Sequence, residues 1–308
     1  MGSGEWGRQM REHEHLEIEQ RLRDHVEMLA GKIGPRHVGD PPSMRQAVEY
    51  IREQFSRAGY PVTEQSYPVA ETEAANLIAR IEGTDRSGET VVLGAHYDTV
   101  PTTPGADDNA SAVAVLLETA RLLRDLPSRR TIHFVAFACE ELPHYHTMTM
   151  GSQVYARRCR ERGERIRGMI CLEMVGYFTD EPNSQGYPDE MPKWLRWIFP
   201  RRGNFLAAVG NLRSWRLGIA FRRGFKRATR FPLYSISLPE FLGFIRRSDN
   251  SSFWDQNYSA LMITDTSYLR NAHYHQPTDL PDTLDYRAMT QVTIGVAGAV
   301  SWLAGEEK

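Results

Sequence analysis

Histidine and carboxylate side chains follow three separate apolar runs of this chain, and both side-chain types bind divalent metals. His96 follows the run VVLGA, Glu140 and Glu141 follow TIHFVAFAC, and Glu173 follows GMICL. Short apolar runs of this kind are typical of buried strands. Open α/β sheets bind their ligands outside the carboxyl ends of the strands. The sequence therefore predicts one metal site, to which three strands contribute at one edge of a sheet.

Two further segments supply candidate ligands outside these runs. Asp108 lies in the loop PGADDNAS, just before a strongly apolar segment at residues 110–126 that predicts a buried helix. The positive end of that helix dipole favours an anion, so Asp108 fits a helix cap as well as a metal ligand. Near the C-terminal end, the segment NAHYHQPTDLPD contains His273, Tyr274 and His275. One of these histidines would complete the site.

The order of the apolar runs predicts the fold class. Strands are expected at residues 62–69, 75–81, 91–95, 132–138, 169–172 and 261–264, and helices at 16–30, 47–58, 110–126 and 292–303. Strands that alternate with helices indicate a single α/β domain, with a mixed, mostly parallel central sheet covered by helices on both faces. We expect residues 1–14 to form a flexible tail and residues 15–308 the domain. Residues 179–230, rich in Pro, Gly, Trp and Arg, are expected to form an irregular insertion over the sheet.

Composition argues against several classes of protein. The chain has 308 residues, 41% apolar and 25% charged, which is ordinary for a globular domain. Its formal net charge of −2 gives no reason to expect a nucleic acid or an anionic membrane as partner. Its three cysteines, without CxxC spacing, predict neither a disulfide framework nor a thiolate zinc site. The N-terminal segment lacks the apolar core of a signal peptide, so we expect a cytoplasmic protein, or an exported one whose leader was removed.

Eleven Lys and Arg residues lie within residues 193–230. We interpret them as the solvated faces of amphipathic helices. In the alternative interpretation, some of them line the cleft and favour acidic substrates.

Five motifs together resemble those of a known family. They are GAHYD at residues 94–98, PGADDNAS at 104–111, EE at 140–141, LEMVGY at 172–177 and YHQPTD at 274–279. Through them, the chain from about Arg21 to Leu303 resembles the co-catalytic zinc exopeptidases of the bacterial leucyl aminopeptidase type. That family also includes glutaminyl cyclases and some carboxypeptidases. The resemblance implies a single-domain zinc-exopeptidase fold and a peptide substrate.

Residue by residue, the resemblance implies two zinc ions. His96 and Glu173 would bind one, Glu141 and His275 would bind the other, and Asp108 would bridge both. Paired metals are a known hydrolytic arrangement. The charges agree, since two zinc ions bring four positive charges, the three ligand carboxylates remove three, and a bridging hydroxide neutralises the last.

The resemblance also implies roles for residues that do not bind metal. Glu140 would act as general base and pass the proton of the bridging water to the leaving amine. Asp98, two residues after the first ligand histidine, would orient that imidazole. Tyr274 would donate a hydrogen bond to the oxyanion. Relatives carry a cis peptide after the bridging aspartate, which implies a cis bond between Asp108 and Asn109.

Two departures from the family pattern bear on specificity. Many relatives have Ser-Asp-His in a loop that shapes the substrate cleft, where this chain has Ser248, Asp249 and Asn250. Aminopeptidases of the family often have Asp at the position of Glu173, whereas cyclases and some carboxypeptidases have Glu.

The leading hypothesis is a zinc aminopeptidase that removes N-terminal residues from peptides. The alternative is a glutaminyl cyclase or a carboxypeptidase on the same scaffold, and a carboxypeptidase would need Arg246 or Arg247 to bind the terminal carboxylate. A non-catalytic binding protein of the same fold is a further alternative, which the retention of all five ligands and Glu140 disfavours. The preferred residue, the native metal and the oligomeric state stay open.

Overall fold

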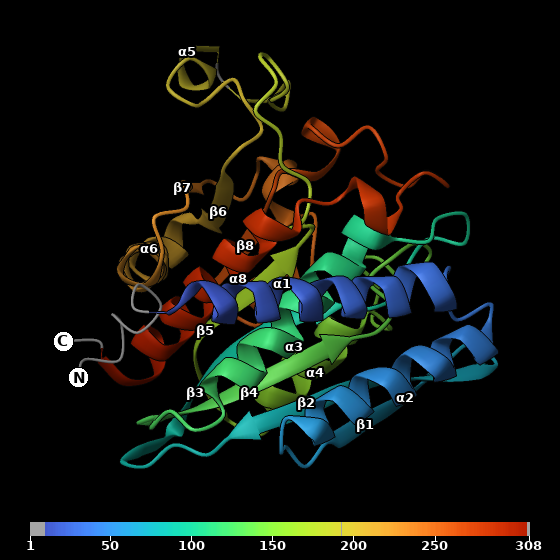
Figure 1. The fold of residues 1–308 in the computed structure, drawn as a ribbon. Helices are drawn as coiled ribbons and strands as arrows, with labels where there is room; N and C mark the ends of the chain where they lie inside the picture. Colours follow the sequence, from blue (N-terminus) through green and yellow to red (C-terminus); the bar gives the residue numbers. More distant parts are fainter. Residues whose placement is uncertain (1–9, 192, 307–308) are drawn as a thin grey trace.

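A single mixed sheet forms the centre of the molecule. A computed structural model describes residues 10–191 and 193–306, and within them eight strands pair in the order β1-β2-β4-β3-β5-β8-β6-β7. The pairs β3–β4, β3–β5, β5–β8 and β6–β7 are parallel, and β1–β2, β2–β4 and β6–β8 are antiparallel. The strands are β1 Thr63–Val69, β2 Thr72–Ile81, β3 Arg86–His96, β4 Arg130–Phe137, β5 Arg165–Glu173, β6 Leu206–Asn211, β7 Leu233–Leu238 and β8 Ala260–Thr264. The predicted mixed sheet is confirmed (Figure 1).

Helices cover both faces of this sheet, as predicted. One face carries α1 Glu12–Val26, α2 Pro41–Arg57, α3 Ala112–Leu123, α6 Trp215–Ala228 and α8 Tyr286–Ser301, which share one apolar core. The other face carries α4 Gly151–Glu161 and α7 Asn250–Asp255, which bury a second, smaller core. The short α5, Lys193–Arg196, projects above the ends of β6 and β7 (Figure 1). Short 3-10 and π-helical turns lie at Glu27–Ile33, Ala106–Ser111, Leu212–Ser214, Gly243–Arg246, Ser267–Leu269, Pro281–Thr283 and Trp302–Glu306.

The helical stretch Tyr286–Gly305 is long and apolar enough to cross a membrane by length and composition alone. In the structure, 83% of its apolar window is buried inside the protein, which agrees with the predicted core helix. Part of this stretch packs closely on α6. A Cβ atom on Gly224 of α6 would lie 2.8 Å from the carbonyl oxygen of Gly298, so only glycine permits this approach of the two helices.

The parallel strands bring the predicted site residues to one edge of the sheet. β3 ends at His96, whose neighbour in register is Phe137 at the end of β4, and the Glu140–Glu141 pair follows β4 directly. β5 ends at Glu173, whose neighbour in register is Thr264 of β8. Because these four strands run in the same direction, their carboxyl ends open onto one site, as predicted.

Two predicted boundaries are wrong. α1 begins at Glu12, so residues 12–14 of the expected tail are helical; residues 1–9 of that tail lie outside the described residues. The backbone N–H of Arg11 donates to the Glu14 carboxylate, 2.6 Å away, which stabilises the first turn of the helix. The expected irregular insertion at residues 179–230 is wrong in its second half, where β6 and α6 lie, and β7 follows it. The β6 sequence LAAVGN did not predict a strand, because alanine and glycine have little strand preference.

Candidate active site

Two groups of possible metal ligands lie at the carboxyl edge of the sheet and share one residue. The first group is His96, Asp108 and Glu173, and the second is Asp108, Glu141 and His275. In each group the ligand atoms lie within 4.8 Å of one another. His96 Nε2 lies 3.3 Å from Asp108 Oδ1 and 3.4 Å from Glu173 Oε2. His275 Nε2 lies 3.1 Å from Asp108 Oδ2 and 3.2 Å from Glu141 Oε1. The structure thus brings together all five residues that the sequence suggested as ligands.

Several atoms of these groups are buried and have no hydrogen-bond partner. They are His96 Nε2, Asp108 Oδ1, Glu141 Oε1 and His275 Nε2. A buried polar atom without a partner costs about 1–3 kcal/mol, so native proteins seldom leave several together. A divalent cation would take their lone pairs, and imidazole nitrogen with carboxylate oxygen is a usual donor set for zinc. The residues therefore fit two divalent cations that share Asp108.

The charge balance of the site supports the same conclusion. Burial raises the pKa of Glu140 well above its usual range, and the Glu173 and Glu141 carboxylates raise it further against the opposing effect of His96. Burial and the nearby Asp108 raise the pKa of Glu141 to about 7. The pKa of His96 rises although burial opposes it, because the Glu173 and Glu140 carboxylates face it. These shifts show an excess of negative charge, which bound divalent cations would neutralise.

Asp98 contacts His96, as predicted, and also binds the start of the Glu140–Glu141 pair. His96 Nδ1 donates to the backbone carbonyl of Asp98 at 3.1 Å, whereas the Asp98 carboxylate lies 3.6 Å from that nitrogen, too far for a good hydrogen bond. The two carboxylate oxygens instead accept the backbone N–H groups of Glu140 and Glu141, each at 3.0 Å. A proton on Nδ1 leaves Nε2 free to bind metal in the neutral imidazole. Asp98 therefore orients His96 through its backbone, and its side chain fixes the start of the Glu pair.

Asp108 does not cap the following helix, which rules out the capping interpretation of this residue. The N-cap residue of α3 is Ser111, and the Asp108 carboxylate faces His96 and His275 instead. Its backbone N–H donates to Asp279 Oδ2 at 3.1 Å. The Asp108–Asn109 peptide bond is cis, as the resemblance implies.

Comparison with known proteins identifies the family. The sequence profile described as Peptidase family M28 matches residues 76–300. The uncharacterised protein YfbL of Escherichia coli (strain K12) is 37% identical over 290 residues, which cover 92% of this chain and 87% of YfbL. This chain belongs to peptidase family M28. The suspected resemblance to zinc exopeptidases is thereby confirmed.

Other proteins match over a smaller part of the chain or at lower identity. Aminopeptidase YwaD of Bacillus subtilis (strain 168) is 42% identical over 87 residues, which are 28% of this chain and 18% of YwaD. The structure of BSAP, a zinc aminopeptidase from Bacillus subtilis, superposes with a TM-score of 0.74 at 16% identity, covering 94% of this chain and 96% of BSAP. A glutaminyl cyclase from Fimbriiglobus ruber gives a TM-score of 0.67 at 20% identity, covering 92% and 95% of the two chains. At these identities the superpositions show a shared fold.

The Ser248 side chain of this M28 protein holds Glu173, one of the candidate ligands, in place. The sequence did not reveal this contact. Its hydroxyl donates to Glu173 Oε2 at 2.6 Å. Sequence reasoning placed the stretch from Ser248 to Asn250 in the substrate cleft and missed this role. The sequence signal for this role was that Ser248 and Asp249 match the first two residues of the Ser-Asp-His found in relatives. The longer Glu173 side chain is thus anchored by a hydroxyl from a neighbouring loop.

Arg36 is a second missed residue, and no motif marks it in the sequence. The side chain is fully buried and donates only to backbone carbonyls, those of Leu29, Gly34, Tyr97, Pro104 and Gly105. Burial lowers the pKa of this guanidinium to about 10 despite the nearby Asp98 and Asp279 carboxylates. Three of the carbonyls belong to the loop between His96 and Asp108, so Arg36 fixes the path of the chain between two candidate ligands.

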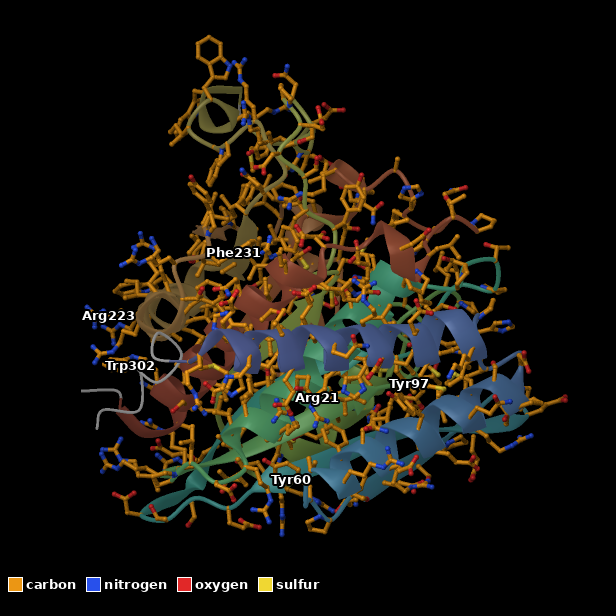
Figure 2. The ribbon with its side chains drawn as sticks, in the orientation of Figure 1. Arg21, Tyr60, Tyr97, Arg223, Phe231 and Trp302 are labelled. Atoms are coloured by element: carbon orange, nitrogen blue, oxygen red, sulfur yellow. The ribbon has the colours of Figure 1, made fainter. Side chains whose placement is uncertain are left out.

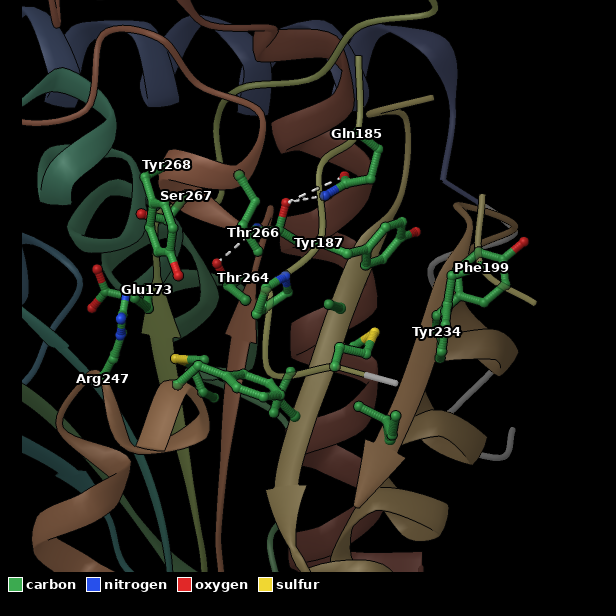
Figure 3. A pocket seen from close by; sticks show the side chains of 18 of the residues that line it. Glu173, Gln185, Tyr187, Phe199, Tyr234, Arg247, Thr264, Thr266, Ser267 and Tyr268 are labelled. Carbon is green, nitrogen blue, oxygen red and sulfur yellow. Dashed lines mark hydrogen bonds between the residues drawn. The ribbon is translucent and has the colours of Figure 1, made fainter. Parts of the chain in front are cut away.

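Two neighbouring cavities lie at the site. One, about 160 Å³, contacts Glu140, Glu141, Tyr145 and His275, and Tyr145 is another residue that sequence reasoning missed. The second cavity, about 120 Å³, is largely apolar and extends between the sheet and residues 185–199. Glu173, Arg247 and Tyr274 line both cavities. Figure 3 shows Glu173, Arg247 and Tyr268 at one end of the second cavity and Phe199 and Tyr234 at the other.

Proposed function

We propose that this M28 peptidase is a zinc-dependent aminopeptidase that holds two zinc ions and removes N-terminal residues from peptides. One observation carries the proposal. Asp108 belongs to both ligand groups, whereas the buried Glu140 belongs to neither. A carboxylate beside a pair of metals, but outside their ligands, is placed to move a proton. Relatives described as zinc aminopeptidases support the choice of metal and of reaction.

His96 and Glu173 would hold one zinc, Glu141 and His275 the other, and Asp108 both. When bound, the two ions would polarise the scissile carbonyl and increase the acidity of a water molecule between them. Glu140 would accept a proton from that water as its oxygen adds to the carbonyl carbon. It would then donate the proton to the leaving amine as the carbon–nitrogen bond breaks.

Tyr274 is proposed to donate its hydroxyl to the carbonyl oxygen as negative charge develops there. Its ring stacks on the His275 ring, with centroids 3.8 Å apart, and it lines both cavities. This stacking fixes the ring beside the second ligand group. Burial and the surrounding carboxylates raise the pKa of Tyr274 strongly, so the hydroxyl keeps its proton and remains a donor.

The apolar cavity supports a preference for a large apolar first residue. Its wall includes Phe199, Phe205, Val209, Phe244 and Met262, and it begins at Glu173 of the first ligand group. A leucine, methionine or phenylalanine side chain would transfer from water into this wall at about 25 cal/mol per Å² buried. A small or charged side chain would gain much less.

A carboxypeptidase is the second candidate, because Arg247 stands where both cavities meet. Arg246, the other candidate from the sequence, pairs instead with Glu240 at 2.7 Å and Asp255 at 2.5 Å. The Arg247 guanidinium lies 5.0 Å from the centre of the Tyr268 ring. It would be the group that binds a terminal carboxylate.

A panel of matched peptides distinguishes these activities. The zinc-loaded protein should release the first residue of free and of C-terminally amidated peptides, and should not cleave N-acetylated ones. A requirement for a free C-terminus, together with loss of cleavage in Arg247→Gln, would establish the carboxypeptidase instead. Release of ammonia from peptides that begin with glutamine, without hydrolysis, would identify a cyclase.

A further inference from the structure

One segment of the chain is strongly basic although the whole protein is nearly neutral. Residues 191–239 contain eleven of the 37 Lys and Arg and none of the 39 Asp and Glu. The remaining residues therefore carry 26 basic and 39 acidic side chains. The net charge of −2 hides a separation of charge between two parts of the sequence.

α6 collects much of this charge on one exposed face. Its inner residues, among them Phe221, Gly224 and Phe225, are buried, and Phe225 packs onto Gly295 of α8. Its outer residues are exposed and include Arg216, Arg222, Arg223, Lys226 and Arg227. The inner face holds the helix against the core, so the outer face presents a fixed row of cations. Figure 2 shows Arg223 pointing outward at this side of the molecule.

In the described part of the chain, no carboxylate neutralises the arginines in the middle of this row. Among the described residues, none forms an ion pair with Arg216, Arg222 or Arg223. Arg216 lies 5.2 Å from the centre of the Trp215 ring, and Arg227 lies 4.9 Å from that of Trp302. Arg216 and Arg227 therefore lie over aromatic rings, and Arg216, Arg222 and Arg223 remain available to an external anion.

Large apolar side chains lie among the cations. Leu212, Trp215 and Ile219 are 57%, 50% and 45% exposed, and all three belong to α6 or to the turn before it. Trp197, beside α5 in the same acid-free segment, is 83% exposed. The segment around α5 lies above the ends of β6 and β7, apart from α6 (Figure 1), and its Phe199 ring lies 6.0 Å from the Tyr234 ring of β7.

We propose that the outer face of α6 binds an anionic phospholipid membrane, with the headgroups on its arginines and Trp215 at the interface. Arginine and lysine side chains near a membrane surface are attracted by anionic lipids, and tryptophan prefers the interfacial region. The exposed leucine and isoleucine fit the acyl boundary, whereas a nucleic acid offers them no apolar partner. Because the cavities open at the carboxyl ends of the strands, this binding is separate from the proposed peptidase activity.

Vesicle sedimentation of the full chain tests this proposal. The protein should bind vesicles that contain phosphatidylglycerol and phosphatidylcholine, and bind poorly to phosphatidylcholine alone. About 0.5 M salt should release it, since salt screens exposed charges. The variant Arg216→Glu with Arg223→Glu should bind at least about tenfold more weakly, because each cation near the surface contributes separately. Peptidase activity on soluble peptides should stay unchanged.

The matched control reverses the same charge elsewhere. Arg45 of α2 and Arg158 of α4 are exposed, and they lie near the opposite edge and on the opposite face of the sheet. Arg45→Glu with Arg158→Glu should keep vesicle binding. Equal loss in both double variants, or equal binding to neutral vesicles, would overturn the proposal. So would binding to duplex DNA or to a second copy of the chain without binding to anionic vesicles. Unchanged thermal midpoints would show that the variants are folded.

Discussion

The loops that carry the candidate ligands and the segment at residues 179–239 are held in different ways. In the ligand loops, buried polar groups fix the backbone, as when Asp98 accepts two N–H groups of the Glu pair and Arg36 binds five carbonyls. In the other segment, aromatic and apolar contacts add to hydrogen bonds such as those from Arg270 to the carbonyls of Gly203 and Phe205. Phe199 and Tyr234 pack by their rings, and Phe225 packs onto Gly295.

This difference matches what each region has to do. Metal ligands must hold fixed distances, and directional hydrogen bonds supply such precision. An apolar pocket and a docking face need shape and charge, which many sequences can provide. We therefore expect the first region to tolerate few substitutions and the second to change specificity or binding without loss of the fold.

The largest effect should come from Glu140→Gln. The amide cannot accept a proton, so kcat should fall by about 10²- to 10⁴-fold. Zinc content should remain that of the wild type, because Glu140 lies outside both ligand groups. Steady-state kinetics and elemental analysis of the same sample check both outcomes. Wild-type turnover in this variant would eliminate Glu140 as the base.

Arg36→Leu should cause the next largest effect, on stability. Five buried carbonyls would lose their donor, and the free energy of unfolding should fall by at least about 3 kcal/mol. Urea denaturation measures this free energy of unfolding. The control is Arg129→Leu, which removes an exposed pair with Asp85 and should change stability little. Similar losses in the two variants would contradict the role given to Arg36.

Removal of metal should destabilise the protein more at higher pH. In the metal-free protein, burial and Asp108 raise the pKa of Glu141 to about 7, and the Asp108 and Glu141 carboxylates raise that of His275 to about 10 against the effect of burial. Both folded-state pKa values exceed the unfolded ones, so the folded state binds more protons and stability falls as pH rises through this range.

Zinc binds deprotonated ligands, so the free energy that zinc binding adds to stability increases as pH rises. This contribution would reach about 4 kcal/mol when the free zinc concentration is a thousandfold above Kd. The difference in thermal midpoint between zinc-loaded and chelated protein should widen from about pH 5 to about pH 8. A difference that is independent of pH would argue against these ligands.

Ala207→Phe should have a smaller and more selective effect. Ala207 is a buried residue of β6 that lines the apolar cavity, and a phenylalanine there would occupy space proposed for the substrate side chain. The ratio of kcat/KM for leucine over alanine substrates should fall about tenfold. The alanine substrate is the internal control. A parallel loss with both substrates would place the pocket elsewhere.

The sequence predicted the centre of the fold better than its edge. Val91, Val92 and Leu93 form a run that only a buried strand explains well, and the neighbouring parallel strands share this feature. β6 was missed and the bounds of α6 were not predicted, because their signals come from packing partners. The basic run at residues 193–230 indicated only that amphipathic helices lie there, which agrees with α6. Gly224 looks like a helix breaker until Gly298 of α8 is seen against it.

The candidate ligands of the site were predictable from the sequence, whereas the residues that hold them in place were much less so. His96, Asp108 and Glu173 stand in motifs whose residue types suggest metal chemistry. Arg36 carries no such signal, because its partners are backbone carbonyls from distant segments. Spacing predicted that Asp98 orients His96, but it cannot tell a carbonyl from a carboxylate as the partner of that imidazole.

The zinc content of the purified protein tests the central claim most directly. The wild type should bind two zinc ions per chain after dialysis against trace zinc, and Asp108→Asn should bind fewer and lose activity, since it serves both ligand groups. An active wild type with one ion per chain, or an Asp108→Asn variant that keeps two ions and full activity, would contradict a shared dinuclear site.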